Sequence, residues 1–112
     1  MILSEEKSGK VMVLGLTGKI DIAGTGVLVK RVTEILDSGE RFILLDFKGI
    51  TYINSSGLCA LVVVGKRLAK SGGKLVLAEV SDPIQKVLKI SGLAAFFTLQ
   101  GTKAEALASF PE

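Results

Sequence analysis

Runs of consecutive apolar residues alternate along the chain with segments whose apolar residues recur every three or four positions. The continuous runs cover residues 11–17, 42–47 and 74–78, and each is typical of a β-strand. The helical spacing covers residues 27–36 and about 58–68. Because the runs at 42–47 and 74–78 are apolar almost throughout, both faces of these strands are expected to be covered, as in a parallel sheet with right-handed connections.

Shorter signals complete the predicted order of elements. A strand near residues 2–6 pairs through a turn at 8–9, a third helix runs from 82 to about 90, an edge strand covers 96–99, and a fourth helix starts at 102. The predicted caps are Thr25 and Gly39 for the first helix, Asp82 followed by Pro83 for the third, and a Thr102–Glu105 capping box for the fourth. The order is β-β-α-β-α-β-α-β-α.

This alternation predicts an α/β fold with a small mixed β-sheet of four to five strands and about four helices. The chain has 112 residues, of which 48% are hydrophobic and 22% charged, so a compact core needs neither disulfide nor metal. No internal repeat or linker is found, and residues 1–112 are expected to form one domain. The only cysteine, Cys59, falls in an apolar helical run and is expected to be a small buried core residue.

Charge and terminal composition exclude several classes of protein. The net charge of +3 comes from 14 basic and 11 acidic residues that are spread along the chain, without the basic stripe that direct nucleic-acid binding requires. The first six residues carry acids where a signal peptide has cations, and no apolar window reaches the length of a membrane span. A cytoplasmic protein without membrane insertion is expected.

The chain lacks the usual residues of catalysis. It contains no histidine, which removes Ser-His and Cys-His nucleophile pairs and the commonest zinc ligand, and it has no phosphate-binding glycine motif. Asp21 and Asp46 lie near the ends of predicted strands and could be paired acids, but Asp46 more simply accepts hydrogen bonds from the next loop. We therefore expect no enzymatic activity, cofactor or metal.

Asn54, Ser55, Ser56 and Gly57 lie between a predicted buried strand and the second helix. A helix N-terminus offers unpaired N–H groups and partial positive charge, so a serine there can cap the helix or carry a phosphate. Both interpretations remain open from the residues alone. The stretch is a candidate switch.

Residues 45–58, which read L-D-F-K-G-I-T-Y-I-N-S-S-G-L, together with T-G-K-I-D-I at 17–22, resemble the STAS family of bacterial anti-sigma factor antagonists. Element order and length agree over essentially the whole chain. The family pattern at the loop is close to D-S-S-G-L. This chain departs from it at Asn54, which removes one negative charge beside the hydroxyl.

The resemblance implies a partner-switching regulator. The unphosphorylated protein would bind a partner that is both a serine kinase and an anti-sigma factor, phosphorylation of Ser55 would release it, and a separate serine phosphatase would restore the cycle. Asp21 matches the family's acidic position near the phosphorylation site. The implied partner-binding residues are Asp21, Asn54, Ser55, Ser56 and Gly57.

Two alternatives stay open beside this interpretation. Ser55 could simply cap the second helix, or the chain could be a STAS-like docking subunit of a membrane lipid-transport ATPase that needs no phosphate cycle. The apolar residues Ile50, Tyr52 and Ile53 beside the motif either pack inward or meet a partner.

Overall fold

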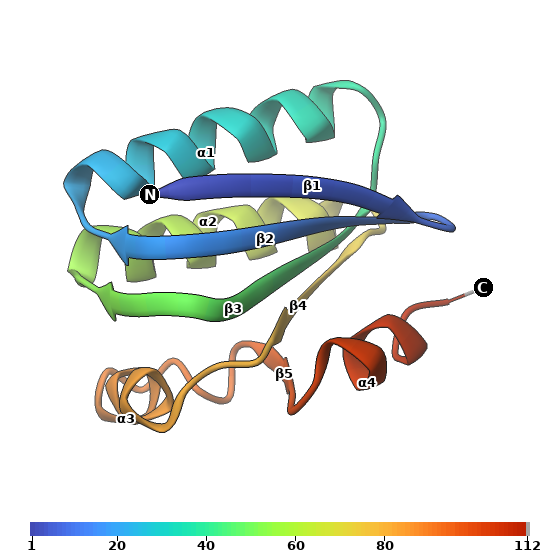
Figure 1. Ribbon diagram of the computed structural model, residues 1–112. Helices are drawn as coiled ribbons and strands as arrows, with labels where there is room; N and C mark the ends of the chain where they lie inside the picture. Colours follow the sequence, from blue (N-terminus) through green and yellow to red (C-terminus); the bar gives the residue numbers. More distant parts are fainter. Residues whose placement is uncertain (112) are drawn as a thin grey trace.

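The computed structural model describes residues 1–111 and has one five-stranded sheet with four helices (Figure 1). The elements in chain order are β1 (Ile2–Ser8), β2 (Val11–Ile20), α1 (Ile22–Asp37), β3 (Phe42–Ile53), α2 (Ser55–Lys70), β4 (Lys74–Ala78), α3 (Asp82–Ile90), β5 (Thr98–Gln100) and α4 (Lys103–Ala108). This order confirms the sequence prediction, and the mixed sheet confirms the predicted fold class.

The strands lie side by side in the order β1-β2-β3-β4-β5. Only β1 is antiparallel to its neighbour, and the other neighbouring pairs are parallel. Helices α1 and α2 lie next to each other against the same face of the sheet, with their N-termini at the same end (Figure 1). The β2–β3 pair therefore carries two parallel helices that start from one edge.

The core has two parts, one on each face of the sheet. The larger part joins β2 and β3 to α1, α2 and α3, and includes the fully buried Leu14, Leu28 and Leu61. The smaller part lies under α4, where Ala106 and Phe110 belong to one cluster with buried residues of β2, β3 and β4. Since α4 is short, it covers only part of that second face.

Helices α1 and α2 have the same length and similar caps, and each begins two residues after the last residue of its strand. Each has 16 residues, and their first residues, Ile22 and Ser55, are 33 residues apart. Their C-caps are serines at the same spacing, and each is followed by a glycine with positive φ, Gly39 and Gly72. These similarities are confined to the caps and helix lengths, so they do not amount to a sequence repeat, and the expectation of no internal repeat stays a prediction.

Several predicted details differ from the structure. Helix α1 starts five residues earlier than expected, because Asp21 and not Thr25 is its N-cap. The N-cap of α3 is Ser81, and Asp82 and Pro83 lie in its first turn. Cys59 is exposed, because the buried side of α2 is formed by residues on the opposite side of the helix.

The edge strand and the last helix follow the prediction more closely. The edge strand is β5, shifted to Thr98–Gln100. At the start of α4, the Thr102 hydroxyl oxygen accepts a hydrogen bond from the backbone N–H of Glu105 at 3.1 Å. The predicted cap is confirmed, and the Thr102 hydroxyl also donates to the Glu105 carboxylate at 3.0 Å.

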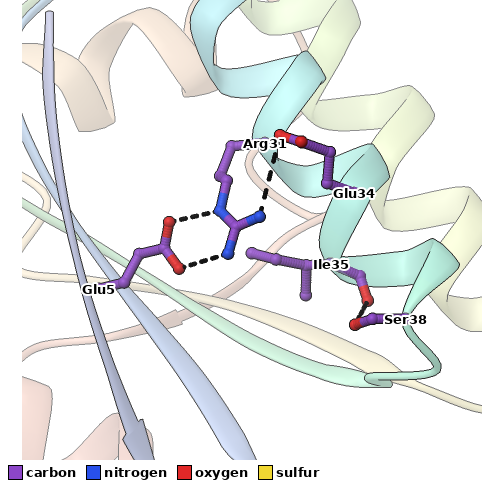
Figure 2. A network of polar contacts seen from close by, with 5 residues as sticks. All are labelled: Glu5, Arg31, Glu34, Ile35 and Ser38. Atoms are coloured by element: carbon purple, nitrogen blue, oxygen red, sulfur yellow. Dashed lines mark hydrogen bonds and ion pairs between the residues drawn. The ribbon is translucent and has the colours of Figure 1, made fainter.

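A surface ion pair fastens the edge strand β1 to α1 (Figure 2). The Arg31 guanidinium donates two hydrogen bonds to the Glu5 carboxylate, of which the one from Nη2 to Oε1 measures 2.7 Å. Arg31 also lies 3.8 Å from Glu34, one turn further along α1. The hydrogen bonds from Arg31 hold the pKa of Glu5 below its ordinary value.

This pair predicts a small acid-dependent contribution to stability. Because the pKa of Glu5 is lowered in the folded protein, the contribution is full above the ordinary pKa of a free glutamate and is lost as pH falls through the folded value. In Glu5→Gln, the free energy of unfolding should fall less steeply with decreasing pH in this acidic range than in the wild type. Urea titrations at several pH values measure this difference. An equal fall in both proteins would contradict the assignment, and high salt should shrink the difference.

Candidate functional site

The candidate site lies where β2 and β3 end beside each other. Ile20 and Ile53 are register partners on these parallel strands. The backbone N–H of Asn54 donates to the carbonyl of Ile20 at 3.2 Å, so the two strands stay joined up to the start of α2. Asp21 and Asn54 therefore follow neighbouring strand ends.

Asp21 and Asn54 cap the two helices in the same way. Asp21 Oδ1 accepts a hydrogen bond from the N–H of Gly24 at 2.9 Å, and Asn54 Oδ1 accepts one from Gly57 at 3.0 Å. Each residue has the extended backbone of an N-cap. The interpretation of Ser55 as the cap is thus wrong, since Asn54 fills that role and leaves the Ser55 side chain exposed in the first turn.

Gly57 allows α2 to start in close contact with the strands. A Cβ at this position would lie 2.7 Å from Ile20 Cγ2 and 2.8 Å from Ile53 Cγ1. Gly24 is equally constrained, because its Cβ would lie 2.2 Å from the carbonyl oxygen of Lys19. The absence of a side chain at both glycines lets the caps form directly at the sheet edge.

The electrostatics of this edge favour an added negative charge. The first turns of α1 and α2 contain no acidic residue, and the two N-termini point to the same side of the molecule. Each N-terminus carries partial positive charge from its unpaired N–H groups. Asp21 supplies one carboxylate beside them, while the neutral Asn54 adds none.

Tyr52 and Ile22 are the exposed large side chains close to the motif. Tyr52 is 47% exposed and Ile22, the first residue of α1, is 78% exposed. Ile50 and Ile53 are buried in the larger part of the core, so these two side chains pack inward, which was one of the two predicted alternatives. Ile22 was missed by sequence reasoning, although the spacing of D-x-x-G at 21–24 and N-x-x-G at 54–57 could have revealed it.

Asp46 does not belong to this site. It lies inside β3, opposite Gly15 of β2, well before the strand end that carries Asn54. Its Oδ1 accepts a hydrogen bond from the backbone N–H of Lys48 at 3.0 Å. The prediction that this partner belongs to the next loop was wrong, because β3 continues to Ile53 and contains Lys48. Asp21 and Asp46 are therefore not a catalytic pair.

The structure brings the five residues proposed from the sequence, Asp21, Asn54, Ser55, Ser56 and Gly57, to one edge of the sheet. Within residues 1–111, no group of three histidine, cysteine, aspartate or glutamate side chains is arranged to hold a metal ion. In the same part of the chain, none of the helices has the length and apolar character needed to cross a membrane.

Comparison with known proteins identifies one family over most of the chain. The model of the STAS domain matches residues 3–106. A Bordetella bronchiseptica protein named as an anti-sigma factor antagonist, BtrV, is 31% identical over 110 residues, which cover 98% of this chain and 95% of that protein.

Solved structures share the fold. One is named as an anti-sigma factor antagonist from Thermotoga maritima, with a TM-score of 0.89 and 23% identity over 95% of this chain and 92% of that one. Another is the Bacillus cell fate determinant SpoIIAA in its phosphorylated form, with a TM-score of 0.74 and 21% identity over 96% of this chain and 97% of that one.

Proposed function

This chain belongs to the STAS domain family, and we propose that it acts as an anti-sigma factor antagonist that switches partners by phosphorylation of Ser55. Unphosphorylated, it binds a serine kinase that is also an anti-sigma factor, and so frees the sigma factor. Phosphorylation ends this binding, and a serine phosphatase reverses the modification. The observation that carries the proposal is the exposed Ser55 in the first turn of α2, directly after the Asn54 cap and at the same edge of the sheet as Asp21.

In the modification step, the kinase supplies ATP and a base. The Ser55 hydroxyl oxygen attacks the γ-phosphorus, a new O–P bond forms, the bond to the oxygen of the leaving ADP breaks, and the hydroxyl proton passes to the base. Ser55 needs no rearrangement of α2 to be reached, because the Asn54 side chain and not the serine satisfies the Gly57 N–H. The chain contributes an acceptor, and all catalytic groups belong to the partner.

Several observations support this cycle over other functions. BtrV, which matches nearly the full length, carries the antagonist name, and the SpoIIAA structure is described as phosphorylated. These relatives favour a regulatory binding protein over a docking subunit of a lipid-transport ATPase. We place the cycle in the cytoplasm, where sigma factors and ATP meet, and assign no nucleic-acid contact to the chain itself.

A displacement assay tests the proposed function. The purified chain is added to a complex of the host's anti-sigma factor kinase with its sigma factor, and free sigma factor is followed by size-exclusion chromatography. We expect the unphosphorylated chain to displace the sigma factor. Retention of the complex at saturating chain concentration would contradict the function, and turnover of ATP or GTP by the chain alone would contradict the non-enzymatic assignment.

Asn54→Asp should speed the phosphorylation of Ser55. Aspartate caps a helix as well as asparagine does, so α2 should keep its start, while a carboxylate is restored beside the acceptor hydroxyl. We expect a rise of severalfold in the initial rate with the host kinase and [γ-³²P]ATP, at nearly unchanged thermal stability. Asn54→Ser, which caps without charge, is the matched control, and an equal rate in all three proteins would show that the missing charge is irrelevant.

A further inference from the structure

Helices α1 and α2 lie side by side, and a strip of residues follows the line along which they face each other. We call this strip the seam; it begins beside Ser55 and runs along both helices. Arg67 of α2 donates to the hydroxyl of Thr33 of α1 at 3.5 Å, so these two residues mark the sides on which the helices face each other. Residues that precede a given residue by four, seven and eleven positions lie on the same side of a helix. These are Ile22, Gly26 and Val29 on α1, and Ser56, Ala60 and Val63 on α2.

Four of the six seam residues that precede Thr33 and Arg67 are exposed, whereas Val29 is half-buried and Ala60 is buried. Ile22 is 78% exposed and Val63 56% exposed, and Gly26 and Ser56 are also exposed. No seam residue before Arg67 carries a charge, although 22% of the chain is charged. A lack of charged residues together with exposed apolar side chains is typical of the centre of a protein–protein interface.

No contact within the described part of the chain requires a glycine at position 26. It lies within α1 without a positive φ, and a Cβ built on it would meet no atom within 4 Å. Glycine in a helix interior forms helix less readily than alanine does, so this residue weakens α1. By contrast, Gly24 and Gly57 are required by contacts with the strands. A glycine on an open surface is explained if another chain approaches the helix backbone closely there.

We propose that the seam formed by Ile22, Gly26, Ser56 and Val63 is the docking surface for the serine kinase that phosphorylates Ser55. This inference rests on the function proposed above. Phosphoryl transfer requires the kinase to reach the Ser55 hydroxyl, and the neighbouring residue Ser56 already belongs to the seam. The kinase must therefore cover the end of the seam at the N-termini of α1 and α2. There Ile22 offers an apolar side chain for contact, and phosphorylation of Ser55 does not alter this side chain.

Two glutamine substitutions on α1 test the surface. Gly26→Gln places a long side chain in the seam, where the open space lets the protein fold. Val27→Gln is the matched control: Val27 is 44% exposed, and it lies four residues before Arg31, which pairs with Glu5 of β1 on the flank away from α2. Affinity for the purified host kinase with ADP is measured by calorimetry, and thermal unfolding verifies that both variants fold.

We expect Gly26→Gln to weaken kinase binding at least tenfold, and Val27→Gln to change it less than twofold. Ile22→Ser, which copies the residue found at the matching place in α2, should also weaken binding. Wild-type affinity in Gly26→Gln, or an equal loss in Gly26→Gln and Val27→Gln, would overturn the docking surface while leaving the function intact. Failure of the wild-type chain to bind the kinase at all would overturn both.

Discussion

Phosphorylation of Ser55 is expected to weaken binding of the kinase partner about a hundredfold. A phosphoserine brings about 1.5 to 2 negative charges at neutral pH. Next to the N-terminus of α2 this charge is favourable to the free protein, so the fold is kept. In the complex the same charge must lose water within a contact that contains uncharged residues such as Ser56 and Ile22. A loss of about 3 kcal/mol corresponds to the hundredfold change.

Calorimetry with stoichiometrically phosphorylated and unphosphorylated protein measures this effect. Ser55→Glu should show a smaller loss, because glutamate carries one charge where phosphate carries nearly two. Ser55→Ala, which adds no charge, is the control and should bind the kinase as the unphosphorylated wild type does. Equal affinity of the phosphorylated and unphosphorylated proteins would contradict a switch that works through partner release. A fall in the melting temperature on phosphorylation would contradict the favourable placement at the helix N-terminus.

Gly57→Ala is expected to destabilise the protein by about 2–3 kcal/mol, whereas Gly26→Ala should stabilise it. At Gly57 the added methyl group would lie under 3 Å from two buried isoleucine side chains and 3.0 Å from the Ile20 carbonyl oxygen, which forces the helix start away from the sheet. At Gly26 the methyl group meets open space and only the helix propensity changes, by up to about 1 kcal/mol.

Urea unfolding of the two alanine variants measures both effects against the wild type. The pair is matched because each change adds one methyl group within the first five residues of a helix on the same face of the sheet. Opposite signs are the expected result. A similar shift in both variants would show that the close approach at Gly57 does not govern the start of α2.

The order of elements followed from the sequence because β4 and the first half of β3 are largely buried, and their runs of apolar residues are interrupted only by Asp46. The start of α1 did not follow, since Gly24 and Gly26 carry no side chain and Ala23 carries only a methyl group, which shows no clear helical period. The helix is held there by the Asp21 cap and by packing against the sheet, which override a weak local preference.

The site was only partly visible in the sequence. The motif around Ser55 stood out, but the assignment of the cap depended on which oxygen reaches Gly57, and that contact is a matter of geometry. Cys59 was misplaced because the apolar run of α2 continues onto its exposed side, as Val63 also shows. The matching D-x-x-G and N-x-x-G spacings could have pointed to Ile22, but its position near Ser55 follows only from β2 and β3 ending side by side.

The most direct test of the switch is to map the phosphate after the host's anti-sigma factor kinase and ATP have acted on the wild-type, Ser55→Ala and Ser56→Ala proteins. Tandem mass spectrometry of proteolytic fragments separates the two adjacent serines. The phosphate is expected on Ser55 in the wild type and in Ser56→Ala, and absent from Ser55→Ala. Phosphorylation of Ser55→Ala to the wild-type level would contradict the assignment of Ser55 as the switch.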